Sequence, residues 1–221
     1  MEEEAHLAIL ADDELWFPPV EQALDDGLLA VGSDLSVARL LLAYRSGIFP
    51  WFNEEDPILW WSPDPRCVLF PEKMKVSKSM KALLKKDAFE FRVDTAFEEV
   101  IRSCAMIERE GQPGTWITQE IIDAYQEMHV QGYAHSAEVW QDGVLAGGLY
   151  GVLLGRIFFG ESMFSRVSNA SKYAFIKWAD HLQAKGITLI DCQMHTPHLE
   201  SLGAEMIPRS QFIALVKAAT V

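Results

Sequence analysis

The sequence predicts an α+β protein in which a small N-terminal α/β domain precedes a larger domain built on a mixed sheet. Seven of the ten prolines lie within the first 71 residues, so this part of the chain differs from the rest. Beyond it, helical periodicity gives way to strand alternation interrupted by Asp142-Gly143, a strong hairpin signal. We therefore expect one domain over 1–63 and a second over 64–221.

The N-terminal domain contains one clear helix, predicted over 36–47. Ser36 is a good N-cap residue and Gly47 a good stop, and the intervening residues are mostly apolar. The prolines and turns around the helix indicate a small unit that ends between Trp61 and Pro65.

The larger domain alternates helices with strands. Ser77 and Thr118 are the predicted N-caps of two of its helices. The order of elements matches an N-acetyltransferase-like (GNAT-like) mixed-sheet domain. The predicted elements are helices over 77–86, 95–108 and 118–132, a turn at 111–114, an antiparallel meander of strands at 134–140, 144–154 and 156–162, a helix over 169–186, a buried strand over 187–194 and a helix over 210–220.

Composition excludes several classes of protein. A hydrophobic share of 49% with 23% charged residues is ordinary for a globular protein. No apolar run approaches the ~20 residues of a membrane helix, so we expect no membrane association. The N-terminus lacks the pattern of a signal peptide, and three cysteines form no disulfide framework. We therefore expect a cytoplasmic protein.

The net charge of −13 hides an uneven distribution. The segment 66–92 contains eight basic and three acidic residues, a local +5, so the remainder carries −18. No basic residue precedes Arg39, whereas ten acidic residues lie between Glu2 and Asp34. A cationic stretch and an anionic remainder attract different partners.

Three polar side chains in apolar strands are candidates for chemistry. Asp191 and Gln193 share one face of a buried strand, where the amide can donate to the acid and still contact a substrate. Glu161 is flanked by Phe159 and Met163 on its predicted face, and burial there would raise its pKa toward neutrality. The structural alternatives are that Asp191 caps the strand end and that Glu161 lies on an edge strand and faces water.

Other chemistries have weaker signals. The spacing of Cys192, His195 and His198 resembles a metal site, but Cys192 points away from the face of Asp191 and a proline interrupts the segment, so we expect no metal. No Walker loop or dinucleotide-binding loop is present. The pyrophosphate-binding stretch of acetyltransferases is missing too, so coenzyme A is not the expected acyl donor.

Tryptophans near prolines and turns form the last group of candidates. Trp51, Trp60, Trp61 and Trp116 lie outside periodic segments, and exposed rings of this kind stack on the bases of single-stranded nucleic acid. Packing between the two domains is the alternative, and for Trp60 and Trp61 it is at least as good an explanation.

Seven stretches together resemble the leucyl/phenylalanyl-tRNA–protein transferases. The resemblance runs in order from about Phe17 to Arg209. It implies transfer of leucine or phenylalanine from tRNA to proteins that begin with arginine or lysine, which marks them for degradation, without a cofactor. The stretches are GLLAVGSDLSVARLLLAYRSGIFPWF, DPILWWSPDPRCVLFPE, GTWIT, AHSAEVW, FFGESMFSRVSNASK, LIDCQM and SLGAEMIPR.

The resemblance also implies roles for individual residues. Asp191, Gln193 and Glu161 match the proposed active-site residues of the family, and Trp51 and Trp116 match aromatics associated with the terminal adenosine of tRNA. The cationic stretch would contact tRNA phosphates, through Lys73, Lys75, Lys78, Lys81, Lys85 and Lys86. The pocket for the aminoacyl side chain maps onto Leu149, Met163, Phe175, Trp178, Leu182 and Ile190, and an apolar pocket of this kind separates leucine, phenylalanine and methionine only weakly.

The mechanism expected from the sequence assigns the proton transfer to Asp191, oriented by Gln193, while Glu161 holds an amino group; the two acids could exchange these roles. A monomer that binds leucyl-tRNA or phenylalanyl-tRNA and an acceptor protein is expected. The alternatives are a non-catalytic module that binds tRNA or protein N-termini, and an acetyltransferase that uses coenzyme A.

Overall fold

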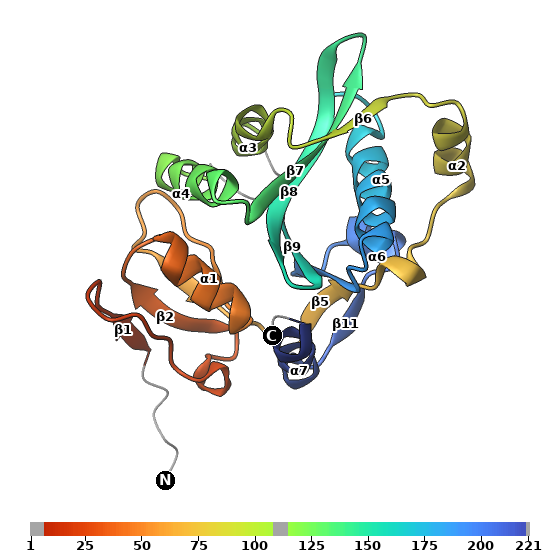
Figure 1. The fold of residues 1–221 in the computed structure, drawn as a ribbon. Coiled ribbons are helices and arrows are strands. Elements are labelled where there is room, and N and C mark those ends of the chain that lie inside the picture. The colour runs from red at the N-terminus through yellow and green to blue at the C-terminus, as the bar shows by residue number, and fades with distance from the viewer. Residues whose placement is uncertain (1–6, 108–114, 220–221) are drawn as a thin grey trace.

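The computed structural model describes residues 7–107 and 115–219, which form two sheets with helices packed on both faces of the larger one (Figure 1). The larger sheet is mixed. Strands β9 (Ile157–Ser165) and β10 (Leu189–Gln193) are parallel, whereas β8 (Val144–Leu154) pairs antiparallel with β9 and β5 (Arg66–Leu69) pairs antiparallel with β10. The predicted α+β class with a mixed sheet is confirmed.

The N-terminal sheet has four strands in the order β1-β2-β4-β3. Helix α1 (Val37–Arg45) connects β2 to β3, and it begins where predicted because the side chain of Ser36 accepts a hydrogen bond from the backbone N–H of Arg39. The strands are β1 (Ala8–Leu10), β2 (Leu28–Gly32), β3 (Phe49–Pro50) and β4 (Leu59–Trp61).

The second sheet has seven strands in the order β11-β5-β10-β9-β8-β7-β6. Asp142 and Gly143 both have positive φ, 52° and 76°, as the predicted tight hairpin between β7 and β8 requires. The strands are β5 (Arg66–Leu69), β6 (Glu90–Val93), β7 (Ala134–Gln141), β8 (Val144–Leu154), β9 (Ile157–Ser165), β10 (Leu189–Gln193) and β11 (Glu205–Ile207).

Helices cover both faces of this sheet. Helix α5 lies across one face with α2 beside it, and α3 and α4 lie on the other (Figure 1). The helices are α2 (Lys78–Lys85), α3 (Phe97–Ala105), α4 (Gln119–Val130), α5 (Ala170–Ala184), α6 (Pro197–Ser201) and α7 (Arg209–Ala219), with short 3-10 turns at Val20–Gln22 and Pro71–Lys73.

Most predicted helix starts agree with the structure. The side chains of Ser77 and Thr118 accept hydrogen bonds from the first turns of α2 and α4. Helix α3 begins two residues later than predicted, because the buried carboxylate of Glu138 accepts hydrogen bonds from Thr95 and from the backbone of Ala96. The predicted end of this helix at residue 108 and the turn at 111–114 lie outside the described residues.

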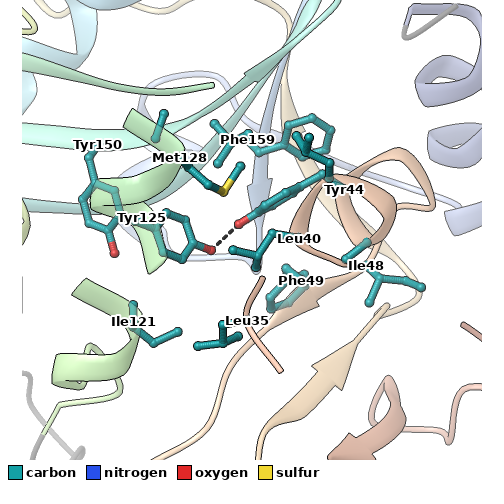
Figure 2. Packing of buried hydrophobic residues seen from close by; sticks show 14 of the residues in the cluster. Leu35, Leu40, Tyr44, Ile48, Phe49, Ile121, Tyr125, Met128, Tyr150 and Phe159 are labelled. Carbon is teal, nitrogen blue, oxygen red and sulfur yellow. Dashed lines mark hydrogen bonds between the residues drawn. The ribbon is translucent and has the colours of Figure 1, made fainter. Parts of the chain in front are cut away.

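The two sheets share one hydrophobic core. Leu40 and Tyr44 of α1 pack in the same cluster as Tyr125 of α4 and Phe159 of β9 (Figure 2). The division into units 1–63 and 64–221 stays a prediction, because the apolar contacts of the first unit continue into the second.

None of the helices in the described ranges is both long and apolar enough to cross a membrane.

Candidate active site

A cavity of about 350 Å³ opens where the middle strands of the large sheet face the N-terminal unit. Its walls are mostly apolar, and its polar lining includes Glu161, Asp191 and Gln193. The three acid and amide side chains selected from the sequence are therefore brought to one cavity. The apolar lining includes Phe49, Trp51, Trp116, Leu149, Phe158, Met163, Phe175 and Ile190.

Of the six residues predicted for the aminoacyl side-chain pocket, four line the cavity and two lie outside it. Leu149, Met163, Phe175 and Ile190 line the cavity, but Trp178 and Leu182 do not. Both lie in the core on the α5 side of the sheet, where they are 2% and 0% exposed. The ring of Phe158, which does line the cavity, packs edge-on against that of Trp178 with 5.2 Å between the ring centroids.

Glu161 occupies a β-bulge in an internal strand. Gly160 and Ser162 pair with the consecutive residues Gly151 and Tyr150 of β8, so Glu161 has no partner of its own. The bulge reverses the alternation, and Phe159 and Met163 lie in different clusters on opposite faces. The prediction that these two side chains flank Glu161 on one face is therefore wrong.

The carboxylate of Glu161 is buried among hydrogen-bond donors. It is 9% exposed and lies between β8 and β10, not on an edge strand. Its Oε1 accepts from Tyr44 at 2.8 Å and from the amide of Gln193 at 2.9 Å, and its Oε2 accepts from Tyr125 at 3.2 Å. Burial raises the pKa of Glu161 to about 7, against the hydrogen bonds from the two tyrosines.

Asp191 is held by a buried arginine. The Nε and Nη2 atoms of Arg66 donate to its two carboxylate oxygens at 2.9 and 2.7 Å, and both side chains are at most 1% exposed. The guanidinium lies between the rings of Phe49 and Phe212, 4.7 and 4.6 Å from their centroids. Asp191 thus links β10 to β5, and both of its carboxylate oxygens accept hydrogen bonds from Arg66.

Gln193 makes a different pair from the one predicted. Its backbone N–H donates to Asp191 Oδ1 at 2.9 Å, while its side-chain amide donates to Glu161. An irregularity between Asp191 and Gln193, with φ of 60° at Gln193, turns the side chain away from the regular alternation. Asp191 therefore positions the backbone of the glutamine, and the glutamine orients Glu161.

Two of the four candidate tryptophans reach the cavity. Trp51 and Trp116 line it, and the backbone carbonyl of Trp51 accepts a hydrogen bond from the indole of Trp61 at 2.7 Å. Trp60 is fully buried and packs on Phe17 in the N-terminal sheet. Trp60 therefore presents no exposed ring, and its contact with Phe17 lies within the N-terminal unit instead of between the two predicted domains.

The six candidate lysines, Lys73, Lys75, Lys78, Lys81, Lys85 and Lys86, are all exposed. They lie on α2 and the turns beside it, and Lys73 is paired with Glu205 at 2.8 Å. Arg66 belongs to the same basic stretch of the sequence but is buried in the site, so it does not add to this surface.

No group of three or more His, Cys, Asp or Glu side chains within 7–107 and 115–219 is arranged to hold a metal ion. In the segment that resembled a metal site, His195 contacts Glu200 at 3.1 Å.

Sequence reasoning missed three residues that organise the site: Arg66, Tyr44 and Tyr125. Both tyrosines lie on apolar helix faces, and a buried hydroxyl there needs a partner, which was an available signal. Arg66 had a weaker one, a lone cation at the start of an apolar run. Nothing in the sequence indicated which acidic side chain the arginine or the two tyrosines would contact.

A largely apolar cavity that ends at a buried carboxylate with a raised pKa has the character of an enzyme site that holds an apolar group beside a polar one. Residues 68–217 match the family model described as leucyl/phenylalanyl-tRNA protein transferase, and residues 33–64 match the model of its N-terminal domain. The chain therefore belongs to the leucyl/phenylalanyl-tRNA–protein transferase family, as its motifs indicated, and is an aminoacyltransferase.

Relatives of this family match nearly the whole chain. The leucyl/phenylalanyl-tRNA–protein transferase of Chromobacterium violaceum is 59% identical over 203 residues, which cover 91% of this chain and 87% of the relative. That of Flavobacterium johnsoniae is 56% identical over 205 residues, 93% of this chain and 97% of the relative.

Likeness to solved structures is weaker. L-PGS from Bacillus licheniformis has a TM-score of 0.43 at 13% identity, covering 75% of this chain and 53% of its own. A GCN5-related N-acetyltransferase from Kribbella flavida has a TM-score of 0.36 at 10% identity, covering 76% and 59%.

Proposed function

We propose that the protein transfers leucine or phenylalanine, and also methionine, from aminoacyl-tRNA to the N-terminal amine of proteins that begin with arginine or lysine, marking them for degradation. The observation that carries this proposal is the cavity itself. Its apolar walls suit the aminoacyl side chain, and Glu161 at its polar end suits an amine. We further propose that the enzyme acts as a cytoplasmic monomer and needs no cofactor.

A direct test supplies radiolabelled leucyl-tRNA with a peptide that begins with arginine, and in parallel with a peptide that differs only in beginning with glutamate. Label is expected on the arginine peptide and not on the glutamate peptide, because the strongly anionic protein attracts a basic N-terminus. Label on neither peptide would refute the proposed activity, and equal label on both would refute the acceptor preference.

We assign the proton transfer to Glu161 and a positioning role to Asp191. Both oxygens of Asp191 are engaged by Arg66, whereas Glu161 lines the cavity and its Oε2 accepts a hydrogen bond of 3.2 Å from Tyr125. A base with a pKa of about 7 suits proton transfer at neutral pH. This assignment moves the proton transfer from Asp191, where the sequence placed it, to Glu161, and it gives Asp191 a positioning role in place of a contact with an amine.

The proposed reaction conserves protons within the site. The neutral amine of the acceptor attacks the ester carbonyl carbon, the C–N bond forms, and the excess proton on nitrogen moves to Glu161. The C–O bond to the ribose then breaks, and Glu161 returns the proton to the departing ribose oxygen. Gln193 orients Glu161 during both transfers, and Trp51 and Trp116 stack on the terminal adenosine at the cavity.

We also propose that the exposed lysines of α2 bind tRNA phosphates. Replacing Lys81 and Lys85 together by alanine should weaken tRNA binding and reduce the steepness of its salt dependence, because each lost phosphate contact lowers the slope of log K against log salt by about 1. Binding of a labelled tRNA measured at several salt concentrations gives both quantities.

The matched control is the double replacement of Lys185 and Lys217 by alanine, which removes the same charge from exposed positions outside the basic stretch. It should leave the slope unchanged. If both double variants change the slope equally, net charge alone governs binding and α2 is not the contact surface.

A further inference from the structure

Two buried tyrosines from different parts of the chain meet at Glu161. Tyr44 comes from α1 in the N-terminal unit and Tyr125 from α4, and their hydroxyl groups point toward each other (Figure 2). Each also contacts one oxygen of the Glu161 carboxylate. Both tyrosines are 0% exposed, so these hydroxyls have been taken out of water and need partners in the protein.

The three groups form a closed triangle of oxygen contacts. Burial raises the pKa of both tyrosine hydroxyls well above their ordinary value, so each keeps its one proton. With Glu161 ionised, the two hydroxyl protons serve three contacts: either both hydroxyls donate to the carboxylate, or one hydroxyl donates to the other, which donates to the carboxylate. With Glu161 protonated, its proton can be donated to Tyr125, Tyr125 donates to Tyr44, and Tyr44 donates to Oε1.

The contact between the tyrosines is what allows the arrangement with Glu161 protonated. Without it, a Tyr125 hydroxyl that accepts the proton of Glu161 would lose Tyr44 as the acceptor for its own proton, and an unsatisfied buried donor costs free energy. The triangle satisfies the carboxyl group in both protonation states by rotation of hydroxyl groups alone, with no movement of the rings.

We propose that Tyr44 and Tyr125 are positioning residues for aminoacyl transfer, whose hydroxyl groups hydrogen-bond Glu161 in both its ionised and its protonated form. This inference rests on the proposed role of Glu161 as the proton acceptor. Under this inference the N-terminal unit contributes a residue to the active site, because Tyr44 of α1 hydrogen-bonds Glu161.

Packing of the two tyrosine rings does not explain why the residues carry hydroxyl groups. The ring of Tyr44 packs on Phe159 with 5.0 Å between centroids, and that of Tyr125 packs on Tyr150 at 5.7 Å. Phenylalanine would fill the same space, so core packing alone explains the rings but not the oxygen atoms.

The direction of the expected effect follows from the groups around Glu161. Burial raises its pKa, Asp191 of β10 raises it further, and Tyr44, Tyr125 and Arg66 of β5 lower it. Because bonds donated to a charged carboxylate are stronger than bonds to a neutral one, losing a hydroxyl raises the pKa.

The test compares Tyr44→Phe and Tyr125→Phe with wild type in single-turnover transfer from pH 5.5 to 9. In each variant the acidic limb of the profile should move to higher pH by about one unit, so that the rate on that limb falls about tenfold while the alkaline plateau changes less. Tyr173→Phe is the control, because Tyr173 is buried on the other face of the sheet, and its profile should match wild type. Thermal unfolding verifies that each variant is folded.

A second measurement separates this inference from the proposed function. Carbon-13 NMR follows the carboxyl group of Glu161, assigned by its absence in Glu161→Gln, as the free enzyme is titrated without tRNA. Shifts of both the NMR midpoint and the rate profile support the inference. An unshifted NMR midpoint overturns it and leaves the proposed function standing. A shifted midpoint with an unshifted rate profile overturns the role of Glu161 in transfer, and this inference with it.

Discussion

Arg66→Met is expected to lower the free energy of unfolding by about 3–5 kcal/mol, because it leaves Asp191 as an unpaired charge in the core. The two side chains are 1% and 0% exposed and joined by two hydrogen bonds, so water cannot replace the lost partner. The variant also removes the cation that packs between Phe49 and Phe212. Urea denaturation at neutral pH measures the change.

Two controls separate the buried charge from other effects. The double variant Arg66→Met, Asp191→Leu should recover much of the stability, because no buried charge is left without a partner. Lys73→Met breaks an exposed ion pair with Glu205 and should cost less than about 1 kcal/mol. If Arg66→Met costs no more than Lys73→Met, the buried pair does not stabilise the protein as proposed.

The same double variant tests the positioning role of Asp191. It removes the acceptor that holds the backbone N–H of Gln193, so the amide of Gln193 loses its fixed orientation toward Glu161. We expect transfer to stay low even where stability returns. If the double variant recovers both its stability and its rate of transfer, Asp191 affects transfer only by stabilising the fold.

Local signals predicted the parts of the fold that depend on local chemistry. The caps at Ser36, Ser77 and Thr118 were predicted because a side chain and the helix it begins are neighbours in sequence. The hairpin was predicted because Asp142-Gly143 tolerates positive φ. In each case the deciding interaction spans only a few residues.

Contacts between distant residues set the arrangement of the site, and the sequence does not reveal them. Arg66 and Asp191 lie 125 residues apart, and Tyr44 and Glu161 lie 117 apart. Arg66 also belongs to a cationic stretch, which favoured a surface position that the structure contradicts. The bulge at Glu161 was equally hidden, because one unpaired residue reverses the alternation without any change in composition.

Glu161→Gln is expected to lower the rate of transfer at least ~100-fold, the ordinary contribution of a group that moves a proton in the rate-determining step. Glutamine keeps the size of the side chain and its hydrogen bonds, since its amide oxygen accepts from Tyr44 and Gln193 and its amide nitrogen can donate to Tyr125. Single-turnover transfer with saturating peptide measures the loss. A rate within threefold of wild type would exclude Glu161 as the proton acceptor.

The same variant should become more stable than wild type as the pH rises. The pKa of Glu161 is about 7 in the folded protein and 4.5 as the ordinary value, so the unfolded chain ionises first. In wild type, the protonated carboxyl group of Glu161 therefore contributes its full stabilisation to the folded state below pH 4.5, and this stabilisation is lost as the pH rises to 7 and above. A difference of 2.5 pH units corresponds to about 3 kcal/mol, and glutamine does not titrate.

Urea denaturation at pH 4.5 and pH 8 should thus show the stability of Glu161→Gln relative to wild type increasing by about 3 kcal/mol between the two conditions. Glu120→Gln, an exposed position at the start of α4, is the control and should show almost no such change. A difference between Glu161→Gln and wild type that does not vary with pH would mean that Glu161 titrates alike in the folded and unfolded chains. If Glu161→Gln is more stable than wild type at pH 8 and has lost transfer, the active site keeps a carboxylate at a position where a neutral side chain would make the fold more stable.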